Sequence, residues 1–195
     1  MTISITANKF YPFNVKDNLK TLDAHKIKQL QKQNSYPFSV AVYNDINDFN
    51  LAGVVRNVCA FGLSKMYIIG RRKWDKRGAV GAYNYIDIIH YPTFDDFVQT
   101  ENILLAPLEL PEHYPDLSPA FFAPIHQIHP AVDTCLLIGL EGSGLPQDHL
   151  IHASMAYYIP QTGCMRSLNA AVASGIALNC LINNYEESRS ISYGA

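Results

Sequence analysis

The sequence predicts a single α/β domain in which a mostly parallel β-sheet is flanked by helices. Short apolar runs alternate with longer segments whose apolar residues recur at helical spacing, an order typical of parallel sheets. The chain has 195 residues, of which 48% are hydrophobic and 16% are charged, so it can bury a continuous core. We therefore expect one domain over residues 1–195, with an N-terminal helical extension over about residues 1–37.

The first half of the chain contains three helical segments and three strands. Leu19, Leu22, Ile27 and Leu30 recur at helical spacing, while the strands are short apolar runs bounded by turn residues such as Asn and Gly. In chain order we expect a helix over Asp17–Gln33, a strand over Ser39–Tyr43, a helix over about Asn50–Phe61 that ends at Gly62, a strand over Lys65–Gly70, a helix capped by Thr93 and running through Val98, and a strand over Ile103–Ala106.

The second half begins with an irregular connection. Six of the eleven prolines lie between Pro107 and Pro130, too closely spaced for a regular helix or a central strand. After it we expect strands over Cys135–Leu140 and Ala156–Ile159 and a closing helix over about Ser167–Asn183, with Ser167 as its cap.

Charge and cysteine usage restrict the environment of the protein. The formal net charge of −2 means that any surface for a polyanion must be local. The four cysteines, at positions 59, 135, 164 and 180, form no C-x-x-C pair, and we expect them to be buried thiols in a reducing compartment. The opening MTISITANKF does not resemble a signal peptide and no apolar run approaches membrane-spanning length, so we expect a cytoplasmic protein without membrane contact.

Three separated segments have unusual composition. In NLAGVVRNVCAFG, Asn50 stands at a helix start and Arg56 projects nearly two turns along, so both can border a cleft that crosses the first turns. In GLEGSGL, Glu141 and three glycines follow an apolar strand, where ligands of open α/β sheets bind. In IPQTGCMRSLN, a strand leads through a loop into an Ala-rich helix.

Each segment alone also has an ordinary structural explanation. Asn50 can cap its helix while Arg56 pairs with an acidic neighbour, and Ser167 can cap the closing helix. The glycines can form a turn beside a solvated glutamate. Their spacing fits neither G-x-G-x-x-G nor a phosphate loop that ends in Gly-Lys-Ser/Thr, which disfavours a dinucleotide or triphosphate site.

In this order, the three segments resemble the signature motifs of the SpoU or TrmH-like family in the SPOUT methyltransferase superfamily. The matching elements are Asn50 with Arg56, Gly139-x-Glu141-Gly142-x-Gly144-Leu145, and Ile159-Pro160 followed by Ser167-Leu168-Asn169, across about residues 38–183. The resemblance implies a C-terminal deep trefoil knot, a homodimer, S-adenosyl-L-methionine as cofactor, and methylation of an RNA ribose 2′-hydroxyl. Leu140, where Asn is common, and Gln161, where Met is common, depart from the family pattern.

The resemblance also assigns roles to residues. The cofactor would be bound by residues of the second and third motifs, namely Gly139, Leu140, Glu141, Gly142, Ile159, Ser167 and Leu168. Arg56 would be the catalytic residue, and Asn50, Glu141, Ser167 and Asn169 would organise the site. Because a guanidinium is essentially always protonated, we expect Arg56 to orient the ribose and a phosphate and to stabilise negative charge, with the proton acceptor left open.

A basic segment, RRKWDKR, offers a local surface for phosphates. It holds five of the fifteen basic residues and one acid, whereas elsewhere acids outnumber bases sixteen to ten. A solvated charged loop is the alternative. Beside a methyltransferase site we expect RNA contact through Arg71, Arg72, Lys73 and Arg77, with Trp74 offering an aromatic face, and through Arg166 of the third motif.

The remaining alternatives concern metal and function. His126 with His129 and His149 with His152 have a spacing that can serve a metal, but no carboxylate or cysteine set completes either pair, so we expect surface or loop histidines and no metal. By the same resemblance, we expect no separate RNA-binding extension of the kind found in several rRNA-modifying relatives, and therefore expect tRNA as the substrate. The alternatives are an rRNA methyltransferase and a noncatalytic RNA-binding or scaffold protein on the same fold.

Overall fold

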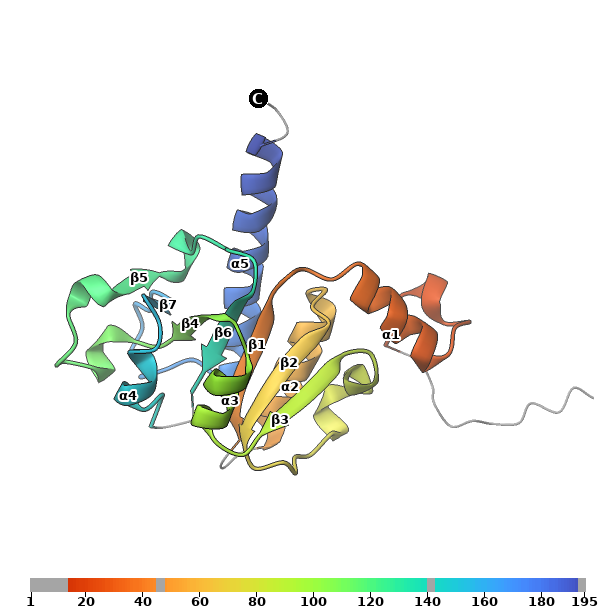
Figure 1. Cartoon of the computed structure of the whole chain (residues 1–195), viewed down its shortest axis with the longest axis horizontal. Helices are drawn as coiled ribbons and strands as arrows, with labels where there is room; N and C mark the ends of the chain where they lie inside the picture. Colours follow the sequence, from red (N-terminus) through yellow and green to blue (C-terminus); the bar gives the residue numbers. More distant parts are fainter. Residues whose placement is uncertain (1–13, 45–47, 140–142, 193–195) are drawn as a thin grey trace, which may run out of the picture.

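The computed structural model describes residues 14–44, 48–139 and 143–192, and within them the chain forms a seven-stranded sheet flanked by helices (Figure 1). The strand order is β3-β2-β1-β6-β4-β7-β5, and every strand pairing is parallel. The α/β class is therefore confirmed, with a sheet that is wholly parallel in the described residues. The strands are β1 (Ser39–Asn44), β2 (Lys65–Gly70), β3 (Asp87–Tyr91), β4 (Leu104–Leu108), β5 (Phe122–Pro124), β6 (Thr134–Ile138) and β7 (Ala156–Tyr158).

Five α-helices accompany the sheet in the part of the chain that is described. They are α1 (Ala24–Gln33), α2 (Asp48–Ala60), α3 (Phe94–Thr100), α4 (Gln147–Leu150) and α5 (Ala170–Ser192). The C-terminal half of α5 extends beyond the rest of the molecule, and α1 lies on the side opposite to β5 (Figure 1). None of these helices is both long and apolar enough to cross a membrane.

The core has two layers because side chains alternate between the two faces of each strand. On one face, Val40, Met66 and Leu136 pack with α2 and α5. On the other face, Ala41 and Tyr67 pack with α3, α4 and the segment that follows β4. Strands buried on both faces are typical of parallel sheets, and this explains why their sequences are continuous apolar runs.

Several predicted boundaries are confirmed. Lys65–Gly70 is a strand with the expected bounds, and Thr93 caps α3 by accepting a hydrogen bond from the Asp96 N–H at 3.1 Å. Gly62 ends α2 with φ +78°, a left-handed conformation that suits glycine.

Other predictions were wrong. The helix expected over Asp17–Gln33 is a 3₁₀ turn, Asp17–Leu19, followed by α1, because Asp23 adopts an extended backbone and caps α1 at the Lys26 N–H. The strand β3 and the short β5 and α4 were not predicted. Cys164 is exposed and Cys59 and Cys180 are half-buried, so only Cys135 is the buried thiol that was expected.

The expectation that the proline-rich segment excludes a central strand was wrong at Pro107. It lies in β4, between β6 and β7, at the position paired with Leu137. The pairing of β4 with β7 is recorded only at Leu108 with Tyr157, so this side of β4 makes few ladder contacts near the proline. A missing N–H is tolerated where few ladder bonds are made.

Candidate functional site

A pocket of about 360 Å³ opens at the carboxyl ends of β4, β6 and β7. Part of its lining comes from residues at or just after these strand ends, namely Leu108, Glu109, Ile138, Gly139, Tyr158 and Ile159. The loop before α5 and the first turns of that helix supply Gln161, Arg166, Ser167, Leu168, Asn169, Ala170 and Ala173. Ligands of open parallel sheets bind at this edge, so this pocket is the candidate site.

Two glycines make room for a buried carboxylate at this pocket. A Cβ at Gly139 would lie 2.5 Å from Glu109 Oε1, and one at Gly144 would lie 3.0 Å from both carboxylate oxygens. Gly144 also has φ +69°, which disfavours any other residue there. The glycines are therefore required by the position of Glu109 and by the backbone turn.

Glu109 holds the end of the glycine segment. Its Oε1 accepts a hydrogen bond from the Leu145 N–H at 2.7 Å, and the Tyr114 hydroxyl donates to the Leu145 carbonyl oxygen at 2.8 Å. Its side chain is only 8% exposed, and burial raises its pKa to about 7, although the hydrogen bonds from Leu145, Tyr114 and Leu110 act in the opposite direction. Sequence reasoning missed this residue; its one signal was a carboxylate directly after an apolar strand.

Asn169 connects the loop at the pocket to two helices. Its Oδ1 accepts hydrogen bonds from the Ala171 and Val172 N–H groups at 2.9 and 3.2 Å, so Asn169 caps α5. Its Nδ2 donates to Asn50 Oδ1 at 2.5 Å. The cap expected at Ser167 was wrong because the helix begins three residues later, and Ser167 instead lines the pocket.

Helices α2 and α5 pack in close contact beside the pocket. A Cβ at Gly53 would lie 2.5 Å from the Ala171 Cβ, so the two backbones can approach only with glycine there. Asn57 Nδ2 donates to the Ala171 carbonyl oxygen at 2.6 Å and to Ser174 Oγ at 2.9 Å. The first turn of α5 is therefore fixed to the middle of α2.

Arg56 lies outside the 360 Å³ pocket. Its side chain is exposed, and it lines a second hollow of about 830 Å³ between α2, α5 and the N-terminal segment. Val80, Val172 and Ile176 border the same hollow and are themselves exposed. Within one chain, Arg56 therefore shares an element with Asn50 but no pocket with Gly139 or Ser167.

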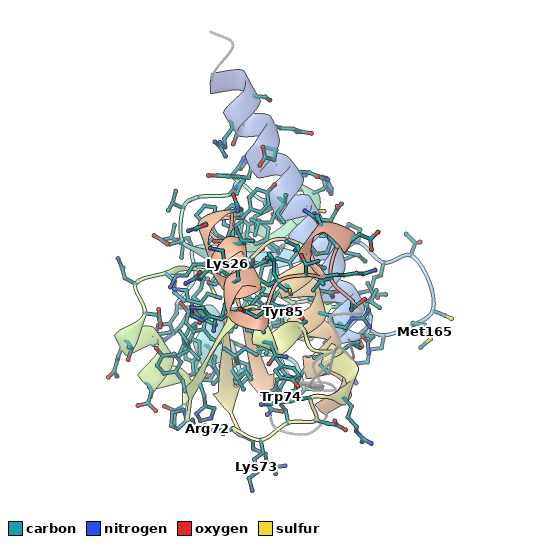
Figure 2. The ribbon with its side chains drawn as sticks, turned by 90° about the vertical axis from the view of Figure 1, so that its right-hand side faces the viewer. Lys26, Arg72, Lys73, Trp74, Tyr85 and Met165 are labelled. Atoms are coloured by element: carbon teal, nitrogen blue, oxygen red, sulfur yellow. The ribbon has the colours of Figure 1, made fainter. Side chains whose placement is uncertain are left out.

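The basic segment forms an exposed loop that is anchored at its start. Asn44, at the end of β1, donates from Nδ2 to the carbonyl oxygens of Arg71 and Lys73 at 2.6 and 3.1 Å. Figure 2 shows Arg72 and Lys73 projecting from one end of the molecule, with Met165 standing out at another edge in the loop before α5. The loop therefore presents cations to solvent from a fixed base.

Two members of the basic segment are less available than the sequence indicated. Arg77 pairs with Asp75 at 2.5 Å. Trp74 is half-buried, contacts Tyr83 edge to face with centroids 6.2 Å apart, and has the Lys76 ammonium 5.9 Å from its ring. The aromatic face expected to be free is thus already in contact with protein groups.

The histidines were expected at the surface or in loops, and His149 departs from this. It is half-buried, shares a hydrogen bond with the Tyr43 hydroxyl and stacks on Phe94 with ring centroids 4.0 Å apart. Burial lowers its pKa. Among the residues of known placement, no three His, Cys, Asp or Glu side chains gather as metal ligands would.

Residues 37–179 match the model of the SpoU rRNA Methylase family. The chain belongs to this family. The SpoU match begins just before β1 and ends within α5, so it includes every strand and the whole 360 Å³ pocket. It leaves out α1 and the C-terminal part of α5.

Individual SpoU relatives agree with this assignment. The chain is 25% identical over 135 residues to the tRNA (guanosine(18)-2′-O)-methyltransferase of Escherichia coli K12, which covers 66% of this chain and 56% of the relative. It thus spans about half the length of the curated relatives that it matches. Two solved structures share the fold: TrmH/SpoU tRNA modifying enzyme from A. aeolicus (TM-score 0.70, 20% identity, 87% of this chain and 85% of that one) and AdoMet-bound rRNA methyltransferase from Sinorhizobium meliloti (TM-score 0.65, 24%, 80% and 59%).

The structure brings many of the residues predicted from the SpoU resemblance together. Gly139, Ile159, Arg166, Ser167, Leu168 and Asn169 line one pocket, and Asn50 reaches it through Asn169. Leu140, Glu141 and Gly142 lie outside the described residues. Arg56 and the basic residues Arg71, Arg72, Lys73 and Arg77 do not line this pocket.

Proposed function

We propose that this protein is an S-adenosyl-L-methionine-dependent methyltransferase that modifies a ribose 2′-hydroxyl of tRNA. One observation carries the proposal. Three strand ends and the loop before α5 line a single pocket, and Asn169 in that loop is hydrogen-bonded to Asn50. Membership of the SpoU family supports the reaction class. The relatives whose names give tRNA as their substrate support tRNA.

The volume and lining of the pocket suit a nucleoside cofactor such as S-adenosylmethionine. Its volume of about 360 Å³ lies within the range of small-molecule sites, roughly 300–1,000 Å³. Apolar side chains of Leu108, Ile138, Ile159 and Leu168 offer surface to a purine, while backbone at Gly139 and Gly144 lets a ligand approach closely. We assign cofactor binding to this pocket, together with the adjoining residues Leu140, Glu141 and Gly142.

When bound, the cofactor would supply a methyl group from its sulfonium to the ribose 2′-oxygen: a new carbon–oxygen bond would replace the carbon–sulfur bond, a neutral thioether would leave, and the hydroxyl proton would pass ultimately to solvent. The protein must align the two reactants and stabilise the developing alkoxide. We propose that Arg56 orients the ribose and an adjacent phosphate through its fork of donors. Asn50, Ser167, Asn169 and Glu141 organise this site, and the exposed Arg71, Arg72 and Lys73, with Arg77 and Arg166, bind phosphates.

We further propose that two chains form a homodimer through α2 and α5. The exposed apolar side chains around the second hollow, Val80, Val172 and Ile176, support this, as does the separation of Arg56 from the cofactor pocket of its own chain. A dimer can bring the Arg56 of the partner subunit to that pocket. We also propose the trefoil knot, which the likeness in fold to SpoU structures supports, and one domain whose N-terminal extension precedes the family match that begins at residue 37. A cytoplasmic location is part of the same proposal.

The decisive experiment is a methylation assay with the purified protein. Methyl-labelled S-adenosylmethionine is incubated with separate tRNA and rRNA pools, and the alkali-resistant linkages that mark 2′-O-methylation are mapped. We expect label in tRNA at a defined nucleotide. Label confined to rRNA would replace the substrate, and cofactor binding without label in any RNA would favour a scaffold.

The Arg56→Ala variant tests the catalytic assignment. We expect it to bind cofactor normally and to lose at least a hundredfold in turnover, in the range of a lost positioning or charge-stabilising group. Arg56→Lys keeps a long cationic side chain at the same position, and unchanged thermal unfolding of both variants controls for disturbance of α2. Normal turnover by Arg56→Ala would remove Arg56 from the mechanism.

A further inference from the structure

Glu109 has an unusual electrostatic environment, and the proposed reaction assigns this residue no role. Its carboxylate lines the cofactor pocket, is largely buried, and has no Lys or Arg partner within 4.0 Å among the described residues. The nearest group that can become cationic is His113, whose Nδ1 lies 3.9 Å from Oε2. A buried carboxylate without a cation carries a large desolvation penalty when it is ionised.

A cationic ligand in the same pocket would offset that penalty. The proposed cofactor carries a permanent positive charge at sulfur, and the demethylated product has a neutral thioether there. We infer that Glu109 is a specificity-determining residue whose carboxylate makes this pocket prefer the sulfonium cofactor over its thioether product. The inference rests on the proposed function, and it gives the enzyme a means of releasing its product.

The position of Glu109 is fixed well enough for its charge to act on a ligand. Its oxygens occupy the space left by Gly139 and Gly144, and Oε1 is held by the Leu145 N–H. It cannot swing into solvent without breaking these contacts. At an effective dielectric constant of about 20, a cation about 8 Å away changes binding by roughly thirtyfold, which sets the scale of the expected preference.

Protonation of Glu109 would remove this preference. Burial raises its pKa to about 7, so the carboxylate changes charge near neutral pH, and a bound cation lowers that pKa. Affinity for the sulfonium cofactor therefore rises as pH increases from 6 to 8, and affinity for the thioether rises less. The other titratable or charged side chains that contact Glu109 or line the pocket, among the described residues, are His113, Tyr114, Tyr158 and Arg166.

His113 is the neighbour of Glu109 at this pocket. One of its ring nitrogens, Nε2, is buried without a hydrogen-bond partner among the described groups. The ring is unchanged in a Glu109→Gln variant, so that variant isolates the charge of Glu109.

The test measures dissociation constants of S-adenosylmethionine and S-adenosylhomocysteine by calorimetry at pH 6 and pH 8. For the unaltered protein, we expect the preference for S-adenosylmethionine to be about tenfold larger at pH 8 than at pH 6. Glu109→Gln keeps the carbonyl acceptor for the Leu145 N–H but removes the charge. It should lose most of the preference at pH 8 and most of the increase in preference between pH 6 and pH 8.

Tyr114→Phe is the matched control. It removes a hydroxyl that bonds the same Leu145 backbone but leaves the carboxylate. Because the Tyr114 hydroxyl also lowers the pKa of Glu109, the preference of this variant should still increase with pH, but over a higher pH range. Equal preference in the unaltered protein and in a folded Glu109→Gln variant would overturn the inference, while RNA methylation could still stand. Failure of the unaltered protein to bind either compound would overturn the proposed function as well.

Discussion

Replacing Asn169 tests the connection between the pocket loop, α2 and α5. Asn169→Ala removes the cap on the Ala171 and Val172 N–H groups and the bond to Asn50. Loss of such a cap costs about 1 kcal/mol, and one exposed hydrogen bond contributes about 0.5 kcal/mol. We therefore expect the free energy of unfolding to fall by about 1.5 kcal/mol, which lowers the Tm by roughly 3–6 °C for a domain of this size.

Urea and thermal unfolding would measure this change, and Asn50→Ala separates its two parts. Asn50→Ala breaks only the bond between the side chains, so its effect should be about 1 kcal/mol smaller than that of Asn169→Ala. The double variant loses the same bond only once, so its destabilisation should be smaller than the sum of the destabilisations of the two single variants. An Asn169→Ala variant as stable as the unaltered protein, or fully additive effects, would refute the described geometry.

Three further predictions concern stability and RNA binding. The pKa of Glu109 is about 7 in the folded protein against an ordinary 4.5, so between these pH values the folded protein binds a proton that the unfolded chain has lost. The free energy of unfolding should therefore fall by up to about 3 kcal/mol as pH rises from 4.5 to above 7. Urea unfolding at pH 5 and pH 8 would measure this loss, and Glu109→Gln should remove it. Gly53→Ala should destabilise the protein by about 1–3 kcal/mol because its Cβ meets that of Ala171, and adding Ala171→Gly should restore stability; a stable single variant would contradict the close packing. The last prediction concerns the three exposed cations of the basic loop, Arg71, Arg72 and Lys73. Neutralising them should reduce the slope of log affinity for RNA against log salt concentration by up to about 3. An unchanged slope would exclude the loop from the RNA-binding surface.

Much of the sheet could be predicted because its strands are buried on both faces. The run Lys65–Gly70 has apolar residues bounded by polar and glycine positions, and its bounds were correct. β3 was missed because its sequence, DIIHY, is half polar and its burial is intermediate along its whole length. The start of α5 was misplaced because Ser167 and Asn169 are both good cap residues, and only the bond to Asn50 distinguishes them.

The ordered motifs predicted six of the residues that line the pocket, but not Glu109. The residues around Gly139, Ile159 and Ser167 could be identified because each motif lies at a strand end or before a helix. Leu145, whose N–H donates a hydrogen bond to Glu109, lies 36 positions later in the sequence. The intervening segment is rich in proline, and its apolar residues show no periodicity. No local pattern reports such a contact, because it depends on how β4 and β6 are paired in the sheet.

The strand order places the basic loop and the 360 Å³ pocket in different halves of the sheet. The loop that carries Arg71 and Lys73 follows β2, on one side of β1, whereas the pocket lies at β6, β4 and β7 on the other side. Asn44 holds that loop through backbone oxygens alone, so its side chains are not part of the anchor. Under the proposed function, selection for a different RNA can therefore change the side chains of this loop while the residues proposed to bind the methyl donor stay unchanged.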